Sequence, residues 1–143
     1  MIVGIVGSEA AKFTAETEQK AKQLIASILM ESLVTGFSSG HCHLGGVDIW
    51  TEEIGSSLLL KPFIYSPMSL NWIGGFKERN MQIAVKSDVV HCITVRTLPG
   101  HYTGMRFESC YHCKTKDHVK SGGCWTIKYA AKLGKKTQLH IID

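Results

Sequence analysis

A Cys/His-rich stretch in the last third of the chain carries the most specific chemistry. Cys110, Cys113, His118 and Cys124 follow the spacing C-x2-C-x4-H-x5-C. Two thiolates separated by two residues can wrap around one metal ion, and Zn²⁺ accepts sulfur and nitrogen ligands in a tetrahedron. The spacing therefore predicts a zinc site with a structural rather than a catalytic role. The alternatives are that Cys124 packs as a small apolar residue and that His118 is an exposed loop residue.

Two glycine-rich turns have the composition of anion-binding sites. They cover residues 39–48 (SGHCHLGGVD) and residues 121–126 (SGGCWT), and each is expected to open a helix. Free backbone N–H groups at the start of a helix attract phosphate oxygens. Arg79, followed by Asn80, adds a guanidinium that can hold a phosphate with two hydrogen bonds. The alternatives are a purely structural turn at residues 39–48 and a solvated helix position for Arg79.

Other residues in these turns have two interpretations each. Trp125 can stack on a nucleobase or pack against the sheet. His41, Cys42 and His43 can hydrogen-bond a phosphate or assist proton transfer, although loop histidines without such a role are common. A Cys42–His nucleophile pair lacks a visible third orienting group.

Apolar segments that alternate with amphipathic segments predict the elements that position these residues. Thr14 is the expected N-cap of the first helix, with Glu16 and Glu18 at the positive end of its dipole. The alternation predicts an α/β, Rossmann-like three-layer sandwich of about five parallel strands with helices on both faces. In such sheets ligands bind at the carboxyl ends of the strands, here in the loops after the first, second and fourth strands. Strands are expected at residues 1–6, 33–38, 61–65, 88–95 and 137–142, and helices at 14–30, 47–59, 76–86 and 125–133.

The segment 96–123 has no convincing periodicity. Its 28 residues far exceed the about 4–6 that usually connect elements in a compact domain. A metal site within it would order a loop that is otherwise entropically costly to fix.

Composition limits the classes of protein. With 143 residues, 44% of them hydrophobic and 20% charged, the chain is expected to form one globular domain over residues 1–143. No apolar run approaches the about 20 residues of a membrane span, and the start MIVGIVGS resembles a strand rather than an export signal, so a cytoplasmic location is expected. Lys and Arg exceed Asp and Glu by 16 to 12, which favours anionic ligands. The lack of long charge runs disfavours duplex DNA and membrane surfaces as partners.

Four segments in order resemble the SLOG superfamily of Rossmann-like domains, which includes the Lonely Guy nucleotide hydrolases, the molybdenum-cofactor carrier proteins and DNA-processing protein A. They are IVGS at 5–8, SSGHCHLGGVDIWTEE at 38–53, ERNMQIAVKSDVVHCITV at 78–95 and SGGCWTIKYAAKLGKK at 121–136. The resemblance implies binding of a nucleotide or nucleotide-derived phosphate ligand and a homodimer. The turns and the resemblance together nominate Gly7, Ser8, Ser39, Gly40, His41, Gly45, Gly46, Asp48, Arg79, Asn80, Gly122, Gly123, Trp125 and Thr126 as binding residues.

The chain departs from the PGGxGTxxE signature of the Lonely Guy enzymes it resembles. Ser121 stands at the proline position, Trp125 at the third glycine and Tyr129 at the catalytic glutamate. A binding module that senses or carries its ligand is therefore expected. The alternatives are a nucleoside 5′-phosphate N-glycosidase whose acid comes from elsewhere, with Glu52, Glu53 and Glu78 as candidates, and a single-stranded nucleic-acid binder.

Overall fold

The computed structural model describes residues 1–143 and contains one parallel β-sheet. The strand order is β3-β2-β1-β4-β5. From β1 the chain adds β2 and β3 on one side and then crosses over to add β4 and β5 on the other side, so the order of addition reverses between β1 and β4. This reversal creates a crevice at the carboxyl edge of the sheet. The strands are β1 (Ile2–Gly7), β2 (Gly36–Ser39), β3 (Lys61–Ile64), β4 (Val89–Val95) and β5 (Lys136–Ile142).

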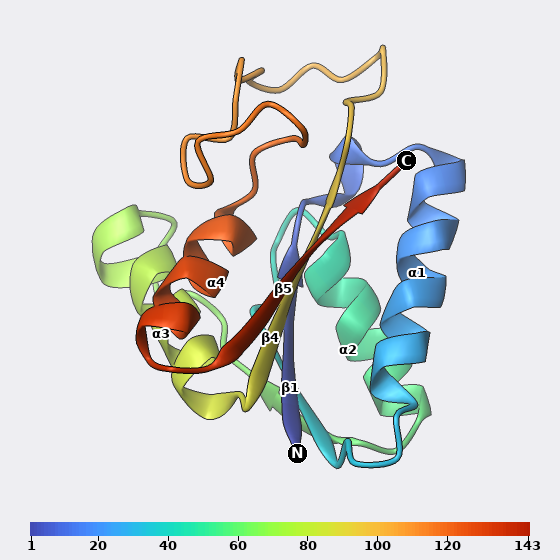
Figure 1. Cartoon of the computed structure of the whole chain (residues 1–143), viewed down its shortest axis with the longest axis vertical. Coiled ribbons are helices and arrows are strands. Elements are labelled where there is room, and N and C mark those ends of the chain that lie inside the picture. The colour runs from blue at the N-terminus through green and yellow to red at the C-terminus, as the bar shows by residue number, and fades with distance from the viewer.

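Helices cover both faces of the sheet (Figure 1). Helices α1 (Ala15–Leu29) and α2 (Val47–Ser57) pack together on one face, and α3 (Lys77–Lys86) and α4 (Gly122–Lys132) pack together on the other. A short turn η1 (Ala10–Lys12) follows β1, and a second short turn η2 (Trp72–Phe76) precedes α3. The expected α/β three-layer, Rossmann-like fold is confirmed.

Local sequence explains the first helix. Thr14 caps α1 and forms a capping box with Thr17, in which each side chain accepts a hydrogen bond from the other residue's backbone N–H. Ala21, Ile25 and Ile28 recur at helical spacing and are buried against the sheet. The expected N-cap is confirmed.

The two faces of the sheet carry separate apolar cores because side chains alternate along a strand. Ile5 of β1 and Phe37 of β2 belong to the core under α1 and α2. Val6 of β1 and Cys92 of β4 belong to the core under α3 and α4, which also contains Cys124. Cys124 is therefore both part of a core and part of the Cys/His stretch.

Several boundaries differ from the sequence expectation. Strand β2 begins at Gly36 rather than at residue 33, because Leu33 lies in the exposed turn after α1. Helix α4 begins at Gly122, three residues before the expected start, because the Ser121 hydroxyl accepts the Gly123 N–H at 3.1 Å and caps the helix. The early start places Cys124 on the first turn of α4.

The connection from β4 to α4 covers residues 96–121 and is two residues shorter than the expected 96–123, because α4 begins at Gly122. Between Arg96 and Ser121 it contains no helix or strand, only an isolated bridge between Cys110 and Thr115. In Figure 1 this segment, drawn in light to dark orange, lies beyond the N-terminal end of α4. None of the helices has the length and apolar character needed to cross a membrane.

Candidate functional site: a cavity at the carboxyl edge of the sheet

A cavity of about 610 Å³ lies at the carboxyl edge of the sheet, where the strand order reverses. Its wall comes from five parts of the chain: the turn after β1, the turn after β2, η2 with α3, the long connection, and the start of α4. The two glycine-rich turns therefore meet at one cavity, as the sequence predicts.

The cavity brings together about two thirds of the nominated binding residues. Ser39, Gly40, His41, Gly45 and Gly46 do not line it, although Cys42, Leu44 and Asp48 of the same turn do. The nominated residues that line it are Gly7, Ser8, Asp48, Arg79, Asn80, Gly122, Gly123, Trp125 and Thr126.

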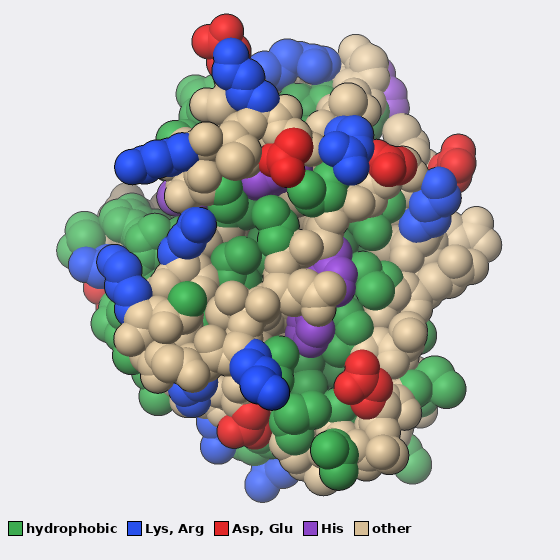
Figure 2. All heavy atoms as spheres, in the orientation of Figure 1, with side chains coloured by type: hydrophobic (Ala, Val, Ile, Leu, Met, Phe, Trp, Pro, Cys, Tyr) green, Lys and Arg blue, Asp and Glu red, His purple; other side chains and the backbone are tan.

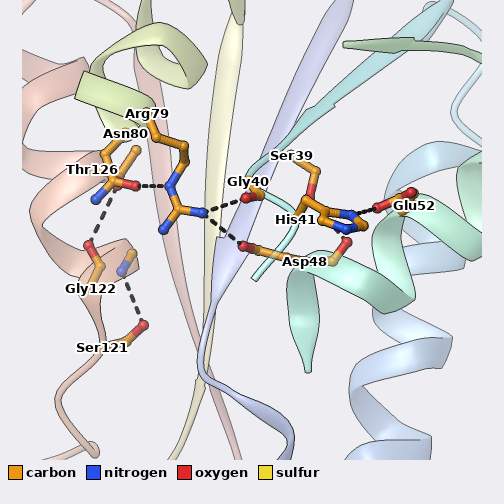
Figure 3. A network of polar contacts seen from close by, with 11 residues as sticks. Ser39, Gly40, His41, Asp48, Glu52, Arg79, Asn80, Ser121, Gly122 and Thr126 are labelled. Carbon is orange, nitrogen blue, oxygen red and sulfur yellow. Dashed lines mark hydrogen bonds and ion pairs between the residues drawn. The ribbon is translucent and has the colours of Figure 1, made fainter. Parts of the chain in front are cut away.

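Arg79 projects from α3 into the cavity and is held on three sides (Figure 3). Its Nε donates to Asn80 Oδ1 at 2.7 Å, and one terminal nitrogen donates to the carbonyl oxygen of Gly40 and lies 3.6 Å from Asp48 Oδ2. The other terminal nitrogen makes no hydrogen bond or ion pair, and the guanidinium lies over the Phe76 ring at 5.5 Å from its centroid. A fixed guanidinium with one free terminal nitrogen is suited to an anionic oxygen.

Asp48 is the buried counter-ion of Arg79. Its side chain is 7% exposed. Burial raises the pKa of Asp48 to about 6, although the Arg79 charge and the Cys42 backbone N–H act in the opposite direction. Asp48 therefore changes protonation state close to neutral pH.

The start of α4 leaves one backbone donor for a ligand. The Ser121 cap uses the N–H groups of Gly123 and Cys124, through its hydroxyl and its carbonyl respectively. The N–H of Gly122 remains without an acceptor in the chain, and Gly122 lines the cavity. A free N–H at a helix start can donate a hydrogen bond to a phosphate oxygen.

The turn after β2 supports the cavity rather than lining it with free amides. The Gly45 N–H donates to the Cys42 carbonyl, and the Val47 N–H donates to the Ser8 carbonyl. Gly46 has φ +88°, and a Cβ there would overlap the backbone of the β1–η1 turn. Ser39 and Gly40 act in the same way, because the Ser39 hydroxyl donates to the Asp48 carbonyl at 3.0 Å and Gly40 accepts from Arg79.

His41 lies outside the cavity. Its Nδ1 is 2.7 Å from Glu52 Oε2, and its side chain is half exposed. Cys42 is half buried in the cavity wall, and burial raises the pKa of its thiol.

Two cavity lysines were not nominated from the sequence. Lys12 in η1 donates from Nζ to the Lys120 carbonyl at 3.2 Å, and its side chain is 13% exposed. Burial lowers the pKa of Lys12, and Glu9 opposes that shift. Lys120 lines the cavity from the long connection. The only sequence signal for Lys12 is its position in the loop after the first strand, where function was expected.

The cavity also has an aromatic wall. The rings of Trp72 and Trp125 meet edge to face with centroids 4.9 Å apart, and Tyr129 stacks on Trp125 at 5.3 Å. Trp72 and Trp125 both line the cavity, together with Phe76 of η2. Trp125 packs on Trp72 and Tyr129 and also lines the cavity, and its stacking on a nucleobase stays a prediction.

The predicted metal ligands lie together beside the cavity. One ligand atom from each of Cys110, Cys113, His118 and Cys124 lies within 4.8 Å of the others. Sulfurs bound at 2.3 Å to a tetrahedral Zn²⁺ are about 3.8 Å apart, so a small closure of the cluster completes the geometry. The cluster could hold a metal ion.

Neighbouring contacts suit this role. His118 is 5% exposed, and its Nε2 lies 3.7 Å from Cys124 Sγ while its Nδ1 is 2.7 Å from Asp117 Oδ1. A carboxylate on the far nitrogen orients a histidine ligand. Burial and the neighbouring thiols raise the pKa of Cys113 to about 12. A divalent cation would reverse that shift, because it stabilises the thiolate.

Comparisons of the chain with known protein families, with curated proteins and with solved structures return no match.

Proposed function

We propose that the protein binds a nucleotide or a nucleotide-derived phosphate ligand in this cavity and acts as a sensor or carrier module. The observation that carries the proposal is that one cavity combines the free terminal nitrogen of Arg79 and the unused N–H of Gly122 with the Trp72–Trp125 wall. A phosphate needs the donors, and a nucleobase needs the aromatic faces.

Charge in the cavity fits a phosphate of the ligand. Three cationic side chains, Lys12, Arg79 and Lys120, line it against two acidic ones, Glu9 and Asp48. The excess of cations persists at neutral pH and increases when Asp48 is protonated. A neutral apolar ligand would desolvate the free terminal nitrogen of Arg79 without offering it an acceptor, which is costly.

The test is a calorimetric titration with AMP, ADP, ATP and inorganic phosphate, supported by thermal unfolding. A nucleotide at 100 times its dissociation constant should add about 2.7 kcal/mol to the free energy of unfolding. Arg79→Ala should abolish the effect, whereas Lys86→Ala, on the same helix outside the cavity, should retain it. No heat and no shift with all four compounds would refute the proposal.

We infer that the metal of the Cys/His cluster is a structural Zn²⁺. Three thiolates and one imidazole are the donors that zinc prefers, and four protein ligands leave no open position for catalysis. Metal analysis should find one zinc per chain. Cys113→Ser and His118→Asn should lose it, and Cys42→Ser, outside the cluster, should keep it. A wild-type protein purified with zinc available yet free of metal would refute this assignment.

A second candidate function is hydrolysis of the base–ribose bond, and one observation favours it. Asp48 is a buried carboxyl in the cavity wall with a pKa of about 6, which is suitable for a general acid. Glu52, Glu53 and Glu78 do not line the cavity. Incubation with nucleoside monophosphates and chromatography for free base is the test. Release by wild type but not by Asp48→Asn would support hydrolysis, and no release leaves binding alone.

Single-stranded nucleic acid is the weaker alternative. On the face drawn in Figure 2, Lys and Arg side chains are interspersed with Asp and Glu and form no continuous basic surface. The net charge of +4 is small for a phosphate backbone that is held mainly by cations.

A further inference from the structure

The metal ligands alternate along the chain with residues that line the cavity. Tyr111 and His112 lie between Cys110 and Cys113, and both line the cavity. Residues 120–123 immediately precede Cys124, and Trp125 follows it; all of them line the cavity. The metal site and the cavity wall are therefore made from the same short pieces of backbone.

Besides the buried Cys110 and the hydrogen bonds from Tyr102 to Glu9 and from Arg96 to the Asp117 carbonyl, few contacts hold this segment in place. At its carboxyl end, the Val119 N–H donates to the Val95 carbonyl and the Thr94 hydroxyl donates to the Val119 carbonyl, each at 2.8 Å. Around the CxxC turn, the local contacts are the bridge between Cys110 and Thr115 and the hydrogen bond from Lys114 N–H to the Cys110 carbonyl. Most side chains from residue 103 to residue 117 are exposed, so apolar burial contributes little order there.

Lys120 connects the segment to the anion-binding groups. Its carbonyl accepts from Lys12 Nζ at 3.2 Å, so the position of Lys12 depends on the segment. Its own ammonium lies over the rings of Phe107 and Tyr111, at 5.1 and 5.2 Å from their centroids. Two of the three cavity cations are thus positioned by a segment that the metal ligands cross-link.

We propose that the metal-held segment is an integral part of the binding site, with Lys120 as a ligand-contacting cation, and that metal occupancy sets the affinity for a phosphate-bearing ligand. The nucleotide part of this inference rests on the function proposed above. When metal is bound, the segment is already ordered before the ligand arrives. Ligand binding then loses less conformational entropy, so a ligand that contacts the ordered wall binds more tightly. Linkage requires the reverse as well: the ligand strengthens metal binding by the same factor.

The first experiment compares ADP binding by calorimetry to zinc-loaded wild type, chelator-treated wild type and Cys113→Ser. Metal removal and Cys113→Ser are each expected to weaken ADP binding at least tenfold. Lys120→Ala should weaken it severalfold with zinc still bound, whereas Lys116→Ala, an exposed lysine of the same segment outside the cavity, should have no effect. In the reverse direction, saturating ADP should slow zinc transfer to a colorimetric chelator. Equal ADP affinity with and without zinc would overturn the coupling and leave nucleotide binding intact.

A second readout is independent of the ligand. Amide hydrogen exchange is measured on zinc-loaded and metal-free wild type, and peptides covering residues 110–126 are expected to exchange faster without metal while α1 peptides do not change. If no compound binds even the zinc-loaded protein, the proposed function fails and this measurement alone decides whether the metal holds the cavity wall. Unchanged exchange in residues 110–126 would overturn that role.

Discussion

Arg79 illustrates how a single residue is prepared for a ligand by its neighbours. Asn80 holds Nε, Gly40 and Asp48 hold one terminal nitrogen, and the other terminal nitrogen makes no hydrogen bond or ion pair. A Cβ at Gly40 would collide with the Arg79 side chain, so this glycine permits the close approach. The sequence nominated both Arg79 and Gly40 as binding residues; in the structure Arg79 lines the cavity, whereas Gly40 does not and instead accepts a hydrogen bond from Arg79.

Arg79→Lys tests whether the shape of the guanidinium is needed in addition to its charge. Lysine keeps the positive charge beside Asp48 but cannot donate to Asn80, Gly40 and a ligand from one planar group. We expect ADP affinity, measured by calorimetry, to fall at least tenfold, or by about 1.4 kcal/mol. Stability in urea should change much less than in Arg79→Ala, which leaves the Asp48 carboxyl without a counter-ion. Wild-type affinity in Arg79→Lys would show that charge alone is sufficient.

At the scale of elements, a substitution of Gly55 in α2 by alanine has two opposite effects on stability, one from helix propensity and one from packing. Replacing a glycine within a helix by alanine normally stabilises a protein by up to about 1 kcal/mol. Here a Cβ would overlap the ring of Phe37, which is fully buried in β2. Overpacking of this kind costs about 1–3 kcal/mol, so the clash should exceed the gain.

We therefore expect Gly55→Ala to lower the free energy of unfolding by about 1–2 kcal/mol in urea denaturation. Ser56→Ala, at the next and exposed position of α2, should stay within about 0.5 kcal/mol of wild type. A stabilised Gly55→Ala would mean that α2 can move away from β2 at little cost.

The elements with strong periodicity were the most predictable from sequence. Helix α1, with Thr14 as its cap, and the buried strand β4 match the expectation closely, because local pattern and tertiary burial agree there. The Ser121 cap was missed because the glycines after it resemble a loop. The turn η2 was missed because Ile73 and Gly74 interrupt any helical period with non-helical dihedral angles.

The candidate metal ligands were more predictable from sequence than the residues of the cavity. Cysteine spacing is a local property, so the four candidate metal ligands could be named from sequence, and their side chains are found together. Lys12 and Trp72 join the cavity only through the crossing of segments that are distant along the chain, and nothing in their local sequence marks them. From the sequence, only the expected sheet topology predicted that the cavity lies at the carboxyl edge of the sheet.

For the whole molecule, stability between pH 4 and 6.5 depends on a half-buried pair of histidines and on the buried Asp48 carboxyl, which act in opposite directions. His91 Nδ1 of β4 and His140 Nε2 of β5 lie 2.9 Å apart in half-buried positions. Burial lowers the pKa of His91 to about 4, helped by the His140 charge, and burial also lowers the pKa of His140. The unfolded chain binds these protons first, so stability is lost as the pH falls below 6.5. For Asp48 the folded state binds the proton first, so stability is lost as the pH rises from about 4 to about 6.

Each shift of two to three pKa units corresponds to about 3 kcal/mol, so the two effects largely cancel in the wild-type protein. Two variants should separate them. In His91→Gln the Asp48 effect remains, and the free energy of unfolding should fall by about 2–3 kcal/mol between pH 4 and pH 6.5 relative to wild type. In Asp48→Asn the histidine effect remains, and the free energy of unfolding should rise by a similar amount relative to wild type between pH 4 and pH 6.5.

His101→Gln is the control: it removes an exposed histidine, and its free energy of unfolding should change with pH in parallel with that of wild type. Urea denaturation of metal-free protein in phosphate-free buffer keeps zinc release and anion binding out of the comparison. Parallel profiles for all four proteins would mean that neither group is titrated in the buried state described here.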